Sequence, residues 1–396
     1  MNTRNGYRWT ILGLAWFCVF TFAIIYQSIP PILGILIDTL RITHSQAGGL
    51  MSLFALPAIL LSIPGGLLAD RYGTRVVGSA SLLVLALGTI IAALGDSYLI
   101  LGLGRLVAGI GTAVVVIVAP KIVTTWFREK EIGASMGIFN TAMPLGTVLS
   151  LSFMGMVGLQ FGWKGPILIG LAVSTLALSL YLLLHRTRSS DGHIEAAPSG
   201  LVASLREAGT GIWWVGLSWA CFNAALISFF TYAPDYFVTQ GKEISQAGLQ
   251  ASYPMWGGLI LSPFTGILID RIGGKWLFVA IGCAGIAALL YLISWFPGQA
   301  TLISILIGVF VAMVPPAVFS SPADLLPERL VGLGFGIIGT VFGVGVFVGP
   351  YVVGILRDVT GTYLWSFTAM AIFAILGVIP MLLLKRQLGK TKGSLK

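Results

Sequence analysis

Long apolar stretches alternate with short polar breaks along nearly the whole chain of 396 residues. A helix needs about 20 apolar residues to cross the hydrocarbon core of a membrane. Apolar windows of that length recur twelve times, and Gly, Pro and charged residues mark most of the breaks between them. The pattern predicts twelve membrane-spanning helices, at residues 9–36, 46–69, 76–95, 98–126, 132–159, 165–185, 211–238, 248–270, 276–296, 299–324, 332–357 and 363–385.

The composition agrees with this pattern. Hydrophobic residues make up 57% of the chain and charged residues 9%, whereas soluble domains carry about 25% charged residues. We therefore expect an all-α membrane protein whose surroundings are a lipid bilayer. The net charge is +9, but no soluble stretch is large enough to present a basic surface to nucleic acid. The three cysteines lie in apolar runs without metal-ligand spacing, so we expect no metal and no cofactor.

The basic residues predict the orientation. Placing the amino terminus in the cytoplasm puts 17 of the 23 Lys and Arg residues on the cytoplasmic side. Two others lie within a span, and four lie outside: Arg41, Lys164, Lys242 and Arg357. Because positive residues favour the cytoplasmic face, we expect a multi-pass protein of the cell (inner) membrane with both termini in the cytoplasm.

The chain repeats itself at an offset of 200 residues. The segment Ser45–Gly48 (SQAG) recurs as Ser245–Gly248, and residues 66–75 (GLLADRYGTR) recur at 266–275 as GILIDRIGGK. Parallel repeats of this kind build transporters from two related halves. The sequence therefore predicts two homologous bundles of six helices each.

A polar stretch at 186–210, rich in Ser, Gly and Pro, separates the two halves. Such composition is typical of an interdomain linker. We therefore predict an N-terminal bundle at 1–185, a cytoplasmic linker at 186–210 and a C-terminal bundle with a short basic tail at 211–396.

The repeated ten-residue segment resembles a signature of the major facilitator superfamily, Gly-x-x-x-Asp-Arg-x-Gly-x-Arg, found between the second and third helices. Residues 66–75 match it fully, and 266–275 differ only at Lys275. A second family pattern in helix 4, Arg-x-x-Gln-Gly-x-Gly, is matched from Arg105 to Gly111, with Ala108 in the Gln position. The resemblance covers the whole chain. It implies two pseudo-symmetric bundles that open one central cavity alternately to each side, and a monomer completes that cavity.

The signature loops are candidates for a conformational latch. Glycines allow close approach and a tight turn, and an aspartate can face the positive end of a neighbouring helix. The resemblance implies that the two aspartates latch the halves together when the cytoplasmic side is closed. In the alternative interpretation these residues only cap helices and orient the protein. The latch residues are Gly66, Asp70, Arg71, Gly73, Arg75, Gly266, Asp270, Arg271, Gly273 and Lys275.

Two cations lie within one predicted span. Ionisable groups inside a membrane are costly and are therefore functional candidates, and the repeat places Ser304 and Ser320 opposite Arg105 and Lys121. The shared scaffold thus demands neither charge. Arg105 is a candidate for substrate binding or coupling, or else it bonds backbone carbonyls. Lys121 either lines the cavity or extends to the lipid headgroups.

The resemblance implies that helices 1, 4, 7 and 10 line the cavity. Polar and aromatic residues near prolines suit a ligand site, although aromatic residues also suit an interfacial belt. The further substrate-binding candidates are Tyr26, Gln27, Asn223, Tyr232, Trp256 and Asn140, and the candidates for coupling are Asp235 and Asp38. No Asp or Glu lies at the middle of a span.

A cavity with buried cations and no central acid favours a small anionic substrate, because a guanidinium binds carboxylates in bidentate fashion. The sequence thus predicts secondary transport of an organic or inorganic anion by alternating access. The alternatives are proton-driven efflux of amphipathic drugs and a transporter-like sensor. No nucleotide-binding loop, metal cluster or nucleophile with a base is present in the sequence, so we expect no enzyme and no catalytic residues.

Overall fold

The computed structural model describes residues 3–127, 131–186, 201–327 and 330–393, and these ranges form helices without a β-strand. The N-terminal half contains α1 (Thr3–Tyr26), η1 (Pro30–Ile32), α2 (Leu33–Leu40), α3 (His44–Leu94), α4 (Tyr98–Phe127), α5 (Ile132–Phe139), α6 (Ala142–Phe161) and α7 (Lys164–Leu184). The C-terminal half contains α8 (Leu201–Glu207), α9 (Gly211–Thr239), α10 (Ile244–Ile272), α11 (Lys275–Ile293), η2 (Pro297–Gln299), α12 (Ala300–Val311), α13 (Val314–Leu325), α14 (Val331–Thr360), α15 (Tyr363–Leu376) and α16 (Val378–Gly393).

The expected spans are present, with local differences. Eleven stretches of the described chain are long and apolar enough to cross a membrane. The remaining expected span, 248–270, corresponds to α10, which is 29 residues long and packs against α6 and α12. Several predicted spans are broken, because the first divides into α1, η1 and α2, and others divide at Asn140, Ala312 and Gly377. The linker is also less irregular than expected, since residues 201–207 form α8, while 187–200 lie outside the described residues.

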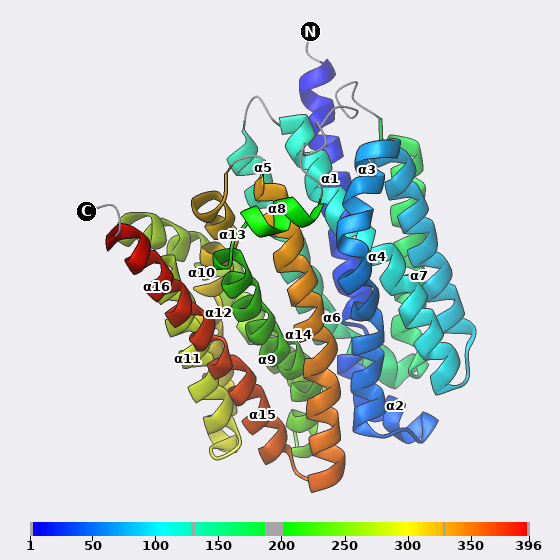
Figure 1. Cartoon of the computed structure of the whole chain (residues 1–396). Coiled ribbons are helices and arrows are strands. Elements are labelled where there is room, and N and C mark those ends of the chain that lie inside the picture. Colours follow the sequence, from blue (N-terminus) through cyan, green and yellow to red (C-terminus); the bar gives the residue numbers. More distant parts are fainter. Residues whose placement is uncertain (1–2, 128–130, 187–200, 328–329, 394–396) are drawn as a thin grey trace.

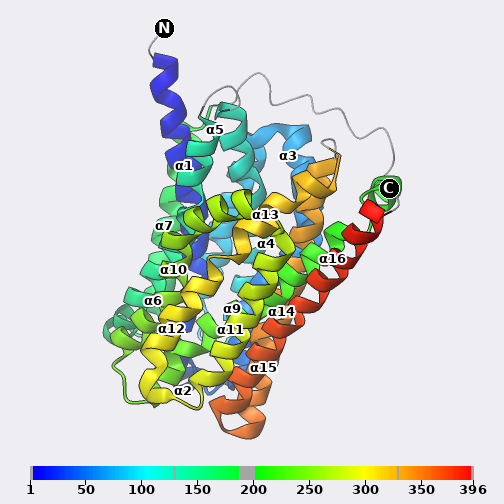
Figure 2. The same cartoon turned by 90° about the vertical axis from the view of Figure 1, so that its left-hand side faces the viewer.

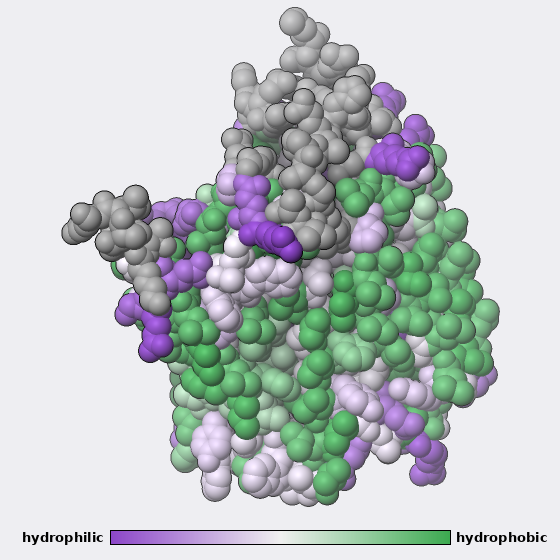
Figure 3. All heavy atoms as spheres, viewed as in Figure 1, coloured by the Kyte–Doolittle hydropathy of each residue, from purple (hydrophilic) through white to green (hydrophobic). Residues whose placement is uncertain are grey.

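The two halves lie side by side, with both chain ends on the same side of the molecule (Figures 1 and 2). We call this the termini side and the opposite end the far side. Hydrophobic residues cover the middle of the face in Figure 3, and hydrophilic residues gather toward its ends. A lipid-facing belt with polar rims accounts for this distribution, because the exposed middle of the protein meets hydrocarbon rather than water.

Glycines let the helices approach closely within each half. A side chain at Gly109 of α4 would overlap the Phe54 carbonyl oxygen in α3, and one at Gly257 of α10 would lie 2.5 Å from the backbone of Gly308 in α12. Small residues at helix contacts are typical of membrane proteins, in which packing replaces the hydrophobic effect. The same kind of contact therefore holds corresponding helix pairs in both halves.

The halves contact each other toward the far side, through the pairs α3 with α14 and α6 with α10. Gly48 in α3 has Pro350 of α14 as its neighbour, so that an added Cβ would lie 2.5 Å from the Pro350 carbonyl oxygen. Gly248 in α10 meets the carbonyl of Leu151 in α6 even more closely. The repeated SQAG segment thus has one structural role in both halves, because its glycine allows one half to pack on the backbone of the other.

Candidate functional site

Arg105 binds the end of α1. Its guanidinium donates from Nη1 to the Ile25 carbonyl oxygen at 2.6 Å and from Nη2 to the Tyr26 carbonyl oxygen at 3.0 Å. It also donates from Nε to the Leu50 carbonyl oxygen of α3 at 3.3 Å. The last carbonyls of a helix lack partners within that helix and carry partial negative charge. Arg105 therefore caps the carboxyl end of α1, which agrees with the alternative in which it bonds backbone carbonyls.

The surroundings of Arg105 are aromatic and buried. The guanidinium carbon lies 4.3 Å from the ring centre of Phe54 and 5.9 Å from that of Tyr26, and Arg105 is only 3% exposed. No carboxylate of the described residues lies within ion-pair distance of it. Among the described residues, the groups that offset this buried positive charge are backbone carbonyls, aromatic rings and the Met51 sulfur, which lies 3.5 Å from Nη2.

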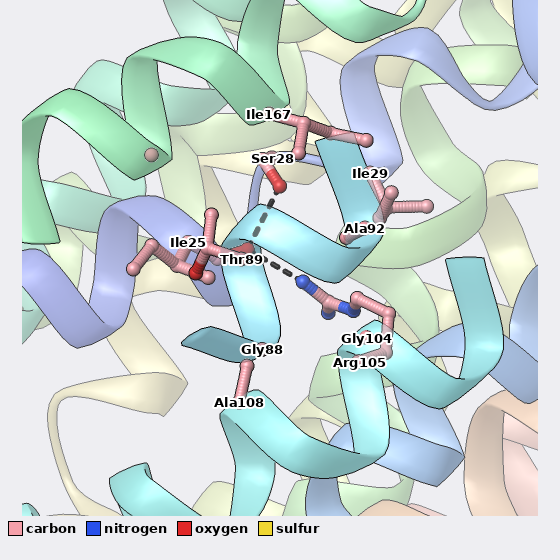
Figure 4. A pocket seen from close by; sticks show the side chains of 11 residues that line it. Ile25, Ser28, Ile29, Gly88, Thr89, Ala92, Gly104, Arg105, Ala108 and Ile167 are labelled. Atoms are coloured by element: carbon pink, nitrogen blue, oxygen red, sulfur yellow. Dashed lines mark hydrogen bonds between the residues drawn. The ribbon is translucent and has the colours of Figure 1, made fainter. Parts of the chain in front are cut away.

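A small cavity adjoins Arg105 inside the N-terminal half. It is lined by α1, α3, α4 and α7, and Figure 4 shows the guanidinium at its edge pointing toward Ile25. Its volume is about 10 Å³, which holds about one water molecule. The cavity is too small for an organic solute and lies between helices of one bundle, so it is not the substrate cavity expected between the halves.

Tyr26 and Gln27 carry buried polar atoms without partners. The Tyr26 hydroxyl and both amide atoms of Gln27 have no hydrogen-bond partner among the described residues. Their exposed fractions are 4% and 0%. An unpaired buried polar group costs about 1–3 kcal/mol, so these atoms are candidates for binding a ligand or a water molecule. Both residues lie where α1 ends, beside the carbonyls that Arg105 holds.

Tyr232 lies at the far-side contact between the halves. Its hydroxyl bonds the carbonyl oxygen of His44 in α3 at 2.8 Å and that of Pro350 in α14 at 2.9 Å. Both bonds use backbone acceptors, and the side chain is fully buried. In this conformation Tyr232 therefore joins the two halves, and its contact with substrate stays a prediction.

Asp235 and Asp38, the two candidates for coupling, have different environments. Asp235 accepts a hydrogen bond from the Tyr363 hydroxyl and lies 3.6 Å from His44 Nε2. It also lies against Gly34 of α2, so it faces the N-terminal half. Asp38 is exposed on α2. The structure therefore places Asp235, and not Asp38, in a network of titratable groups.

The other predicted lining residues lie elsewhere, on α4, α9 and α10 and at the junction of α5 and α6. Asn223 is buried in α9 and donates to the Trp219 carbonyl oxygen of the same helix at 2.8 Å. Asn140 is exposed at the junction of α5 and α6, and Trp256 is 38% exposed on α10. Lys121 is half-buried on α4, and its carbonyl accepts bonds from Thr124 and Thr125. Their substrate roles stay predictions.

The repeated signature loops have the same backbone turn. Gly73 has φ 80° and Gly273 has φ 72°, values that favour glycine over other residues. Arg71, Arg75, Asp270 and Arg271 are exposed, and the Asp70 side chain lies outside the described residues. Lys275 pairs with Asp324 of its own half at 2.6 Å. The structure thus has both turns, while a latch between the halves stays a prediction.

Three residues at the far side were not predicted from the sequence. His44, Asp358 and Tyr363 join Asp235 in a cluster that crosses the contact between the halves. One signal for it exists in the sequence, because Ile244 occupies the position of His44 in the second repeat. Such an asymmetry marks a charge that the shared scaffold does not require.

Comparison with known proteins agrees with the repeat. The sequence profile of the Major Facilitator Superfamily matches residues 15–248 and again residues 241–395. The crystal structure of the nucleoside transporter NupG (D323A mutant) has a TM-score of 0.78, covering 94% of this chain and 99% of that one at 13% identity. That likeness concerns the fold alone.

Two relatives match nearly the whole chain. One is the probable sulfoacetate transporter SauU of Cupriavidus necator, 27% identical, with 96% of this chain and 93% of the relative covered. The other is the probable galactarate/D-glucarate transporter GudP of Escherichia coli, 24% identical, with 85% of this chain and 84% of the relative covered. These relatives are transporters and not enzymes.

Proposed function

The chain belongs to the major facilitator superfamily, and we propose that it moves a small organic anion across the cell membrane by alternating access. It is an integral membrane protein and a secondary solute transporter. The proposal adds the charge of the substrate, the orientation with both termini in the cytoplasm, and a single chain as the functional unit.

The observation that supports an anion is the charge of the interior. Arg105 is the one permanently charged side chain among the buried residues of the described ranges. The carboxyl end of α1 offsets only about half a charge, so a positive potential remains in a region of low dielectric. Such a potential attracts anions and repels cations. A cation carrier normally buries an acid for this purpose, and the described interior holds no buried Asp or Glu.

In this proposal Arg105 holds the end of α1 in place and attracts anions by its positive potential, without contacting the substrate directly. Three of its N–H groups already bond carbonyl oxygens. By holding the end of α1 it fixes Tyr26 and Gln27, whose unpaired hydroxyl and amide are the groups we propose for substrate binding. The substrates named for the two relatives, sulfoacetate and galactarate or D-glucarate, carry acidic groups and support the same substrate class.

The test is uptake by the purified protein in proteoliposomes. The panel contains sulfoacetate, D-glucarate, nitrite, glucose and a lipophilic cation, each with and without a pH gradient. We expect saturable uptake of at least one organic anion and none of the cation. Uptake of the lipophilic cation without any anion overturns the proposal in favour of drug efflux. Uptake of glucose alone shows that the interior charge does not select the substrate.

A further inference from the structure

A cluster of charged and titratable groups bridges the halves at the far side. The His44 ring at the start of α3 lies between two carboxylates of the C-terminal half. Nδ1 lies 3.1 Å from Asp358 Oδ1, and Nε2 lies 3.6 Å from Asp235 Oδ2. The backbone N–H of His44 also donates to Asp358 Oδ1 at 2.8 Å. One side chain of the first half is thus held from both sides by the second.

The ring geometry distinguishes the two charge states of His44. A neutral imidazole has one N–H and one lone pair, whereas an imidazolium has two N–H groups. Both ring nitrogens face carboxylate oxygens here, so a neutral ring directs its lone pair at a negatively charged group. The imidazolium instead donates to Asp358 and pairs with Asp235. The arrangement therefore offers a carboxylate acceptor to each ring nitrogen.

The other groups around the His44 ring contribute little positive charge to offset the two carboxylates. Tyr232 of α9 bonds the backbone carbonyl of His44, and Tyr363 of α15 donates to Asp235. In the described part of the chain, Arg357 of α14 is the arginine that contacts this cluster, with its guanidinium carbon 4.6 Å from the ring centre of Tyr363. The described ion pairs of Asp235 and Asp358 are both with His44, so a protonated His44 offsets the charge of the two carboxylates.

We propose that His44 binds a proton between Asp235 and Asp358, and that this proton favours closure of the far side. The proposal rests on alternating access and on the far side facing the exterior. When the far side opens, His44 moves away from both acids, because they belong to the other half. Proton binding is then tighter in the closed state, and linkage requires that external acid shifts the population toward closure. The ring is 20% exposed, so external water supplies the proton.

The experiment measures far-side opening without any substrate. Ser52 of α3 donates to the Phe347 carbonyl oxygen of α14 at 2.5 Å and is 2% exposed, so a cysteine there is shielded while the far side is closed. Ser52→Cys is made after the three native cysteines are replaced by alanine. Membrane-impermeant maleimide is then added outside right-side-out vesicles at external pH of about 8 and about 5.5, on either side of the ordinary histidine value.

We expect labelling to slow by about two- to fivefold at the lower pH, the range of a partly exposed ion pair. With His44→Gln labelling is fast at both pH values, and with His44→Lys, which carries a permanent charge, it is slow at both. Unlabelled protein is first checked by thermal melting, so that a misfolded variant is not read as an open one. A His44→Gln variant that keeps the full pH response overturns the proposal.

The result separates this proposal from the proposed substrate. Labelling is read without substrate, so a failure of anion uptake leaves the measurement intact. Conversely, anion uptake together with pH-independent labelling of the Ser52→Cys protein overturns the proton site alone. The maleimide reaction itself slows in acid, so a control cysteine is needed. Gly298 is exposed and has no atom within 4 Å of an added Cβ. The labelling rate of Gly298→Cys in the same background is used to correct the Ser52→Cys rate at each pH.

Discussion

Asp358 caps the start of α3 from the other half of the protein. Its two carboxylate oxygens accept the backbone N–H groups of His44 and Ser45, each at 2.8 Å. The next amide, that of Gln46, is satisfied by the Thr43 hydroxyl of the same helix end. Two of the first amides of α3 therefore have their acceptor in the other half of the protein, and we predict that this cap is lost when the far side opens.

Removing the charge of this cap weakens the closed state. In Asp358→Asn one acceptor oxygen and the negative charge are lost from the positive end of α3, a change of about 0.5–1 kcal/mol. We expect faster external labelling of Ser52→Cys, by about two- to fivefold. Asp96→Asn is the matched control, since Asp96 pairs with Lys164 at 2.6 Å within one half. Equal effects of both variants contradict a specific role for Asp358.

The glycine contacts predict a second way to open the far side. An added methyl at Gly248 overlaps the Leu151 carbonyl of the other half, and backbone cannot yield as a flexible side chain does. We expect Gly248→Ala to speed external labelling of Ser52→Cys. Gly339→Ala is the control, because nothing lies within 4 Å of its added Cβ. An unchanged labelling rate in Gly248→Ala shows that the two halves have room for the added methyl group at this contact.

The hydrogen bonds of Arg105 predict that replacing this residue lowers the stability of the protein. Arg105→Ala removes three hydrogen bonds from a charged donor to the carbonyls of Ile25, Tyr26 and Leu50, and a hydrogen bond to a charged group contributes about 1.5–3 kcal/mol. We expect a markedly lower melting temperature in detergent. Arg105→Lys keeps the charge but lacks the planar guanidinium. We therefore expect its melting temperature to lie between those of Arg105→Ala and the wild type. An Arg105→Ala protein that melts like the wild type contradicts the capping role.

The sequence was sufficient to predict an all-α membrane protein of the major facilitator superfamily, because hydropathy and the 200-residue repeat depend only on residue order. It could not separate the two roles of Arg105. The bonds of its side chain depend on α1 ending at Tyr26, inside the single span 9–36 that hydropathy indicates. The far-side cluster was missed for a related reason, since His44, Asp235 and Asp358 come together only when the two halves pack.

The variant Tyr26→Phe distinguishes a role of the Tyr26 hydroxyl in substrate binding from a role of the side chain in packing. Its hydroxyl is buried without a partner among the described residues, so removing it in Tyr26→Phe leaves the melting temperature unchanged or higher. If the hydroxyl binds substrate, the KM for anion uptake rises by about tenfold or more, since a hydrogen bond to a charged group contributes about 1.5–3 kcal/mol. An unchanged KM contradicts the ligand role. Tyr291→Phe, on an exposed residue of α11, is the control.

Counterflow tests the central claim most directly, because it requires both an anionic substrate and alternating access. Proteoliposomes are loaded with unlabelled substrate anion, sulfoacetate or D-glucarate, and diluted into a trace of the labelled compound. We expect the label to accumulate transiently above its equilibrium level, as carrier exchange demands. A monotonic approach to equilibrium indicates a channel, and transient accumulation of labelled glucose in place of every anion tested contradicts the account.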